Sequence, residues 1–283
     1  MKRIICLLSA FCLILLMGGI SFAEWRDDYQ ELLKKGQTQK LYDYALKGGD
    51  VDLADKNGWT PLFLASLEGR VEVIKQLVAR NAFVEAKNRE GLTPLMMASG
   101  IGHLESVKYL IAKGADVNAR TKKGGSALMF ASRCESGLPV VKFLVDKGAN
   151  IDARNEKHTT SLIFATAYGQ DAIVRYLVER GANLEVRSKD WGWTPLIWAS
   201  AFGHLEIASY LVEKGANIEV RANDGMTPLM IASLRQKSSA VKFFLSKGAS
   251  FTKQDMEAVL KQISKEEMVE AGYYWDLHDA IFR

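Results

Sequence analysis

Apolar residues recur along the chain in short groups that return at a nearly constant spacing. Aligning the groups on one leucine each gives spacings of 33, 33, 34, 34 and 33 residues. An alanine follows every aligned leucine by three residues. A period in this range predicts a solenoid, in which each copy buries its apolar face against its neighbours. The aligned leucines are Leu62, Leu95, Leu128, Leu162, Leu196 and Leu229.

Each copy carries the pattern of two short helices. In Gly58-Trp59-Thr60-Pro61-Leu62 the glycine permits a turn, the threonine caps a helix start, and the proline loses no hydrogen bond in the first turn. A second helix is predicted from apolar triplets such as Val107, Leu110 and Ile111, whose spacing places them on one face. Asn81 in the first copy and a glycine in the later ones are predicted to end the second helix in the left-handed conformation. These glycines are Gly114, Gly148, Gly181, Gly215 and Gly248.

The middle copies depart from the pattern. One extra residue lies between Arg133 and Val140, and another lies in the loop around residues 188–191. The third and fourth copies lack the proline, and His158 stands where the loop glycine belongs. We therefore predict local irregularity in these copies.

These residues resemble the ankyrin-repeat family, whose copies run Gly-x-Thr-Pro-Leu-His-x-Ala, then Gly-His, an aliphatic helix and Gly-Ala. The resemblance covers about residues 55–251, and Gly102-His103 and Gly203-His204 match the family's Gly-His segment. It implies an all-α solenoid of six helix-turn-helix repeats joined by hairpin-like loops. The histidine after Thr-Pro-Leu is absent from every copy, so we expect apolar packing to tie the repeats together instead. Its place is taken by Phe63, Met96, Met129, Ile163, Ile197 and Met230.

We divide the chain into a signal peptide (1–23), an N-terminal cap repeat (24–54), six repeats (55–251) and C-terminal cap helices with an aromatic tail (252–283). Terminal repeats have only one neighbour and need a polar outer face. Thr252-x-x-Asp255 and Ser264-x-x-Glu267 have the pattern of capping boxes at the start of two cap helices. The tail carries Tyr273-Tyr274-Trp275.

The N-terminus has the pattern of an export signal. Lys2 and Arg3 precede an apolar run from Ile4 to Ile20, and Ser21-Phe22-Ala23 supplies the small residues of a cleavage site. An uncleaved membrane anchor is the alternative, but the run is slightly short for a span and contains two glycines. We therefore expect a periplasmic or secreted protein with no membrane association after cleavage.

Composition and charge exclude some partners. The chain is 48% hydrophobic and 25% charged, which is typical of a folded protein. Without residues 1–23, which include Lys2 and Arg3, 35 basic residues face 33 acidic ones. Such a balance gives no electrostatic reason to expect nucleic acid or anionic lipid as a partner. We expect the free protein to be a monomer.

No motif for catalysis or metal binding is present. His103 and His204 stand at the family's Gly-His position, where a structural role is expected, and His158 has no partner at metal-ligand spacing. Cys134 is the single cysteine beyond the signal segment, so no internal disulfide can form. We predict no catalytic residue, no cofactor and no metal site. The alternative is an enzyme with a cryptic site near Cys134 and His158.

In ankyrin proteins, partners dock on a concave face lined by loop tips and first helices. By register, three places in each copy map onto it: the residue before the capping threonine, and the fifth and sixth residues after the aligned leucine. Large apolar side chains dominate these places, and exposed aromatic anchors are typical of binding hot spots. The predicted partner-binding residues are Trp59, Leu67, Leu92, Ile101, Arg133, Tyr168, Trp191, Trp193, Phe202, Met226 and Leu234.

We expect these side chains to be exposed in the free protein, with Tyr168, Trp193 and Phe202 in one cluster. The alternative is that they pack sideways against neighbouring repeats and compensate for the missing histidines. The resulting hypothesis is an exported protein-interaction module. Within that class we consider an accessory of an envelope enzyme, an immunity protein against a toxin, and an effector released towards a host. A structural envelope protein that self-associates through its tail is a further alternative.

Prediction for export: the mature protein begins at Glu24, because the charged start, apolar run and small residues match a cleaved signal. The intact mass of the exported protein checks this. A product that still carries residues 1–23 would indicate an anchor instead.

Overall fold

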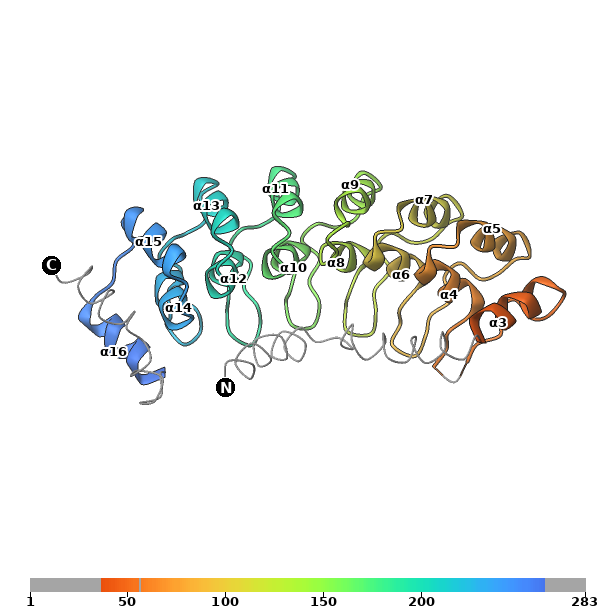
Figure 1. Cartoon of the computed structure of the whole chain (residues 1–283), viewed down its shortest axis with the longest axis horizontal. Coiled ribbons are helices and arrows are strands. Elements are labelled where there is room, and N and C mark those ends of the chain that lie inside the picture. Colours follow the sequence, from red (N-terminus) through yellow and green to blue (C-terminus); the bar gives the residue numbers. More distant parts are fainter. Residues whose placement is uncertain (1–36, 56, 263–283) are drawn as a thin grey trace. The chain divides into compact units, whose positions relative to one another are not determined.

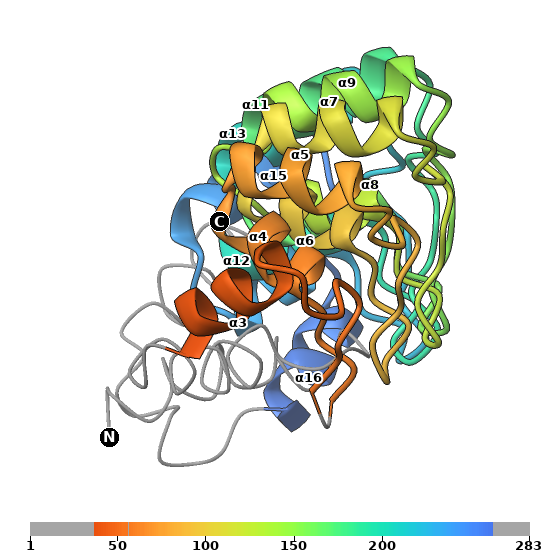
Figure 2. The same cartoon turned by 90° about the vertical axis from the view of Figure 1, so that its right-hand side faces the viewer.

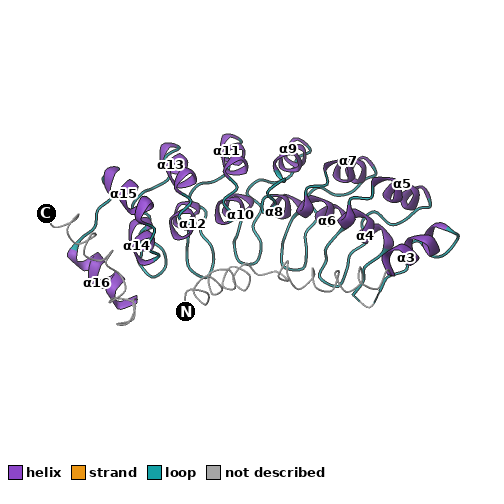
Figure 3. Cartoon of the chain, viewed as in Figure 1, coloured by secondary structure: helices purple, strands orange, loops and turns teal. Residues whose placement is uncertain are grey.

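The computed structural model describes residues 37–55 and 57–262, and its regular structure in these ranges is helical (Figure 3). The chain divides into two compact units, with unit 1 ending at Ser161 and unit 2 beginning at Leu162. Within the described residues, each of the six aligned copies corresponds to one pair of helices. The prediction of an all-α repeat structure is confirmed.

Unit 1 is built from α3 and three helix pairs. The first helices α4, α6 and α8 pack side by side in one row, and the second helices α5, α7 and α9 pack in another (Figures 1 and 2). The bounds are α3 Gln37–Leu46, α4 Pro61–Glu68, α5 Val71–Ala79, α6 Pro94–Ile101, α7 Leu104–Ala112, α8 Ala127–Ala131 and α9 Leu138–Asp146.

Unit 2 has two rows of helices of the same kind. Helix α12 packs against α14, and α11, α13 and α15 form the row of second helices. Helix α16 covers α14. The bounds are α10 Ser161–Ala167, α11 Asp171–Glu179, α12 Pro195–Phe202, α13 Leu205–Glu213, α14 Pro228–Leu234, α15 Ser238–Ser246 and α16 Lys253–Gln262.

The helix ends form as the sequence predicts. In five copies a threonine or serine side chain accepts a hydrogen bond from the backbone N–H three residues later, which satisfies one of the unpaired donors of a helix start. Asn81 has a φ of 65°, so asparagine does take the left-handed place of the later glycines. The caps are Thr60, Thr93, Ser126, Thr194 and Thr227.

Small and apolar residues hold neighbouring copies together. All six alanines that follow the aligned leucines by three residues are fully buried, so the first helices approach closely. The residues that replace the family's histidine are buried as well, which confirms that apolar packing fills their place. They are Phe63, Met96, Met129, Ile163, Ile197 and Met230.

Hydrogen bonds between consecutive copies flank the helices. At the hairpin tips of unit 1, the N–H groups of Arg89, Lys122 and Glu156 each donate to a carbonyl of the preceding tip at 3.0 Å. Closer to the second helices, the Asp116 N–H donates to Glu85 Oε1 at 3.0 Å. In unit 2 the Asn223 N–H donates to the Trp191 carbonyl at 2.8 Å. These bonds fix the spacing of the loops along each unit.

The third copy contains the predicted irregularity. Helix α8 has only five residues and is followed by Ser132 in the right-handed conformation, whereas α4, α6 and α12 are followed by a left-handed glycine. The extra residue is absorbed in the turn that leads to α9. A Cβ at Gly137 would lie 2.1 Å from the Ala131 carbonyl oxygen, so this turn requires glycine.

The C-terminal cap helix α16 begins with the predicted capping box. The Thr252 N–H donates to Asp255 Oδ2 at 2.8 Å, and the Asp255 N–H donates to Thr252 Oγ1 at 3.1 Å. Met256 and Val259 are buried. The signal segment, the first part of the N-terminal cap, the Ser264-x-x-Glu267 pattern and the aromatic tail lie outside the described residues. Within the described ranges, no helix is long and apolar enough to cross a membrane.

Prediction for packing: Leu110→Ala should destabilise the protein by about 2–5 kcal/mol, because this fully buried side chain of α7 would leave a cavity. Denaturant unfolding measures the change. Lys108→Ala on the exposed side of the same helix is the control and should change stability by less than about 0.5 kcal/mol. Equal effects of the two substitutions would contradict the buried stripe.

Candidate functional site

The hairpins and first helices present a set of side chains from four places in each copy. These are the residue before the capping threonine or serine, and the second, fifth and sixth residues after the aligned leucine. The fifth and sixth residues follow the second one by three and four positions, so all three lie on one side of the first helix. We call this surface the first-helix face. It contains the three places singled out from the sequence and adds the second residue after the leucine.

In unit 1 most predicted binding residues on this face are packed. Trp59 is 4% exposed and lies against Phe63, with the ring centroids 5.2 Å apart. The backbone N–H of Trp59 donates to Asp55 Oδ1 at 2.9 Å. Leu67 and Leu92 are buried too, so the expectation that these three side chains are exposed was wrong. Within this unit, Ile101 and Arg133 are half-buried.

In unit 2 the face carries a cluster of four aromatic rings, which we call the aromatic cluster: Trp191, Trp193, Trp198 and Phe202. The Trp193 centroid lies 4.8 Å from that of Trp191 and 4.9 Å from that of Trp198, the latter pair edge to face. Phe202 stacks on Trp198 with centroids 5.8 Å apart and planes at 11°. Such geometries are favourable for aromatic pairs.

Exposure differs within the aromatic cluster and its surroundings. Trp193 is only 7% exposed and Met226 is buried, so the expectation that they are exposed was wrong as well. Trp193→Ala should therefore lower the melting temperature, because it removes a ring wedged between two others. Trp191, Phe202 and Leu234 are half-buried, and Tyr168 at the end of α10 is 36% exposed.

Of the three residues predicted to form one cluster, Trp193 and Phe202 do so through a residue that the sequence pattern did not single out, whereas the place of Tyr168 in it stays a prediction. Trp198 stands two residues after the aligned Leu196 and contacts both rings. A signal for it existed, because this place lies three and four residues before the two helix places that were examined. The other copies carry Leu64, Met97, Phe130, Phe164 and Ile231 there.

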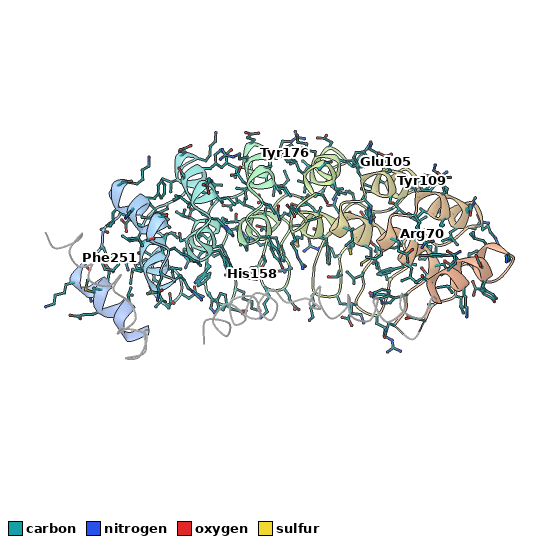
Figure 4. All side chains as sticks on the ribbon, in the orientation of Figure 1. Arg70, Glu105, Tyr109, His158, Tyr176 and Phe251 are labelled. Carbon is teal, nitrogen blue, oxygen red and sulfur yellow. The ribbon has the colours of Figure 1, made fainter. Side chains whose placement is uncertain are left out.

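A second recurring feature was also missed. On five second helices an aromatic ring lies under the cation of the residue four positions later, with cation-to-centroid distances of 5.3 to 5.9 Å. Figure 4 labels two of these rings, Tyr109 on α7 and Tyr176 on α11. Each pair lies at the end of one helix and contributes a small stabilisation to that helix. They are Tyr109–Lys113, Phe143–Lys147, Tyr176–Arg180, Tyr210–Lys214 and Phe243–Lys247.

The two histidines of the Gly-His segments bridge consecutive copies. His103 Nε2 lies 3.0 Å from the Leu67 carbonyl oxygen, and His204 Nε2 lies 3.4 Å from that of Ala167. Burial lowers the pKa of both imidazoles, and these backbone hydrogen bonds oppose the shift. A Cβ at Gly69 would lie 2.6 Å from the His103 ring, so glycine makes room for it.

The other candidates for chemistry are Cys134 and His158. Cys134 is half-buried, and its Sγ lies 3.2 Å from Ser136 Oγ. His158 is exposed in the left-handed conformation with a φ of 56°, at the hairpin labelled in Figure 4. In the part of the chain that the structure describes, no group of three or more His, Cys, Asp or Glu residues could hold a metal ion.

The repeated helix pairs, capped by threonine and tied by the Gly-His imidazoles, agree with a comparison of the chain with known families. A model described as ankyrin repeats (3 copies) matches residues 32–121, 116–188 and 185–255. The chain belongs to the ankyrin-repeat family. Comparison with curated proteins found no match. Ankyrin repeats are protein–protein interaction modules, and the family is generally non-enzymatic.

Prediction for pH: the stability of this ankyrin protein should fall as the pH drops below about 6.5. The folded pKa of His103 and His204 is lowered, so between that value and the unfolded value of about 6.5 the unfolded chain binds more protons. This stability is fully present above the unfolded pKa and is lost as the pH falls through the folded one. Denaturant unfolding from pH 7.5 to 5 measures it.

The double variant His103→Gln and His204→Gln keeps a donor for each carbonyl but does not titrate, so it should flatten this dependence. His158→Asn, at an exposed hairpin position, is the matched histidine control. An unchanged slope in the double variant would show that other groups set it.

Proposed function

We propose that this chain is an exported ankyrin-repeat module that binds a partner protein through its first-helix face. The observation that carries the proposal is the aromatic cluster of unit 2. The repeat folds without aromatic rings at these places, because other copies have residues as small as Gly125, Thr159 and Ala167 on this face. The concentration of rings on this face of unit 2 is therefore not required by the repeat.

The half-buried rings Trp191 and Phe202 form the accessible edges of the aromatic cluster, and the buried Trp193 and Trp198 hold them in place. Preorganised aromatic side chains lose little entropy on binding, which is why hot spots are rich in them. The Trp198 Nε1–H is buried with no acceptor among the described residues. Leaving this buried donor without an acceptor costs about 1–3 kcal/mol, so the repeat carries this indole at a cost.

The partner is proposed to be a protein because the face repeats along consecutive hairpins and first helices instead of closing around a small ligand. Export towards the periplasm or the medium is part of the proposal and is supported by the charged and apolar pattern of residues 1–23. An accessory of an envelope enzyme, an immunity protein and a released effector are all compatible with such a module.

The test compares capture of partners from the envelope extract of the producing cells. A protein retained by the wild type is identified by mass spectrometry, purified, and titrated against Trp191→Ala and Phe202→Ala. Each substitution should weaken binding by about 2 kcal/mol or more if the rings are hot spots. Phe243→Ala removes a half-buried ring from the second helix α15 and is the matched control.

All variants are titrated below the onset of their own unfolding, measured by circular dichroism. The proposal requires a loss of affinity with both face variants and none with Phe243→Ala. Equal affinity of all four proteins would place the contact elsewhere on the chain and overturn the role of the aromatic cluster.

A further inference from the structure

We propose that the third copy carries a second recognition site, in which a partner segment inserts a bulky apolar side chain against Phe130 and places carboxylates beside the neighbouring lysines. This inference rests on the proposed function, because it names a part of the partner that the first-helix face would bind. The site consists of Phe130, Gly100, Gly125 and the basic residues of its hairpin, and we call it the Phe130 site.

Phe130 differs from its equivalents in every other copy. It stands two residues after the aligned leucine, a place where the other five side chains are only 2% to 5% exposed. Phe130 is half-buried. In unit 2 the equivalent Trp198 is covered by Trp193, which comes from the residue before the capping threonine. The corresponding residue of the third copy is Gly125, which has no side chain with which to cover Phe130.

A second glycine opens the other side of the ring. A Cβ at Gly100 would meet only Phe130 within 4 Å, and its nearest contact, at 3.5 Å, would be of ordinary van der Waals length. Gly100 is in the last turn of α6 and has no positive φ, so neither backbone nor space requires glycine. Glycine is unfavourable in a helix, and the first copy has Leu67 at this place. The chain thus keeps a helix-weakening residue where a side chain would cover the ring.

Steric crowding explains in part why position 125 is a glycine. A Cβ there would lie 3.3 Å from Phe130 Cε2 and 3.1 Å from Thr121 Oγ1, which is tight. Its φ is not positive either. Any side chain at this position would therefore press on the Phe130 ring. The two glycines together leave an aromatic surface that matches one inserted side chain, such as leucine or phenylalanine.

Charge around the ring selects the rest of the ligand. Residues 119–134 contain Arg120, Lys122, Lys123 and Arg133 and no acidic residue. Lys122 and Lys123 are exposed at the hairpin tip. Acidic residues flank this stretch, because the Lys122 N–H donates to the Glu90 carbonyl, the Glu156 N–H donates to the Lys123 carbonyl, and Glu135 follows in the turn. A chain of nearly balanced charge thus has four cations and no acidic residue in the stretch that contains Phe130, which complements a segment with Asp or Glu next to a large apolar residue.

The test uses a display library of random twelve-residue peptides selected on the full chain. Enriched peptides should combine a large apolar residue with neighbouring Asp or Glu, and a labelled synthetic consensus peptide should bind in fluorescence anisotropy. Gly100→Leu should weaken this binding at least about tenfold, because the added side chain covers Phe130. Ala112→Leu, which adds the same side chain at an exposed place on α7, is the matched control and should have no effect.

The charge is tested separately. Lys122→Gln with Lys123→Gln should weaken binding about tenfold in low salt and less in high salt, because exposed charges are screened. Lys108→Gln with Lys142→Gln, on exposed positions of second helices, should leave it unchanged. Leucine favours a helix more than glycine does, so Gly100→Leu should fold, and circular dichroism checks this. Gly100→Ala offers a milder change that fits the available space.

Three outcomes overturn the inference: no enriched peptide, enriched peptides insensitive to Gly100→Leu, or tighter binding of a twelve-nucleotide thymidine strand than of the consensus peptide. In each case the captured partner's dependence on Trp191 and Phe202 still decides the proposed function separately. If partner binding does not depend on Trp191 and Phe202 while the peptide still binds at the Phe130 site, the aromatic cluster has no role in binding and the peptide site is retained.

Discussion

The structure depends on how closely one first helix can approach the next. Each copy places an alanine three residues after its aligned leucine, and all six alanines are fully buried. A larger residue there would separate the helices and also the hairpins, whose tips are joined by backbone hydrogen bonds of about 3 Å. Burial of the apolar residues between copies then follows from this spacing, because no helix pair of this size could bury its own face.

Close spacing also explains why the family's histidine could be lost. With the helices held by alanine, the space after Thr-Pro-Leu is filled by side chains such as Met96 and Met129, which are completely or almost completely buried. Methionine is flexible and fills irregular gaps, so it can fill the space that a histidine side chain occupies in the family. The Gly-His histidines keep their own bridging role, and the lowered pKa of His103 and His204 couples that bridge to protonation.

Much of the fold could be predicted from the sequence because its signals are local. Thr60 as a cap, Asn81 as a left-handed terminus and the capping box at Thr252 depend on residues within a few positions of each other. The exposure of the binding residues could not be predicted in the same way. Trp59 packs against Phe63, and Trp193 packs against Trp198. The exposed fraction of each tryptophan therefore depends on the residue at another position of the same copy. The uncovered state of Phe130 likewise follows from two glycines in different copies.

The three indoles of the aromatic cluster have a spectroscopic consequence. Their centroids are 4.8 to 5.8 Å apart, close enough for their electronic transitions to couple. Trp59 has Phe63 as its ring partner and lies in unit 1. Light absorbed by the indole cluster therefore reports on unit 2, and its circular dichroism provides an intrinsic label for the melting of that half of the chain without any added dye.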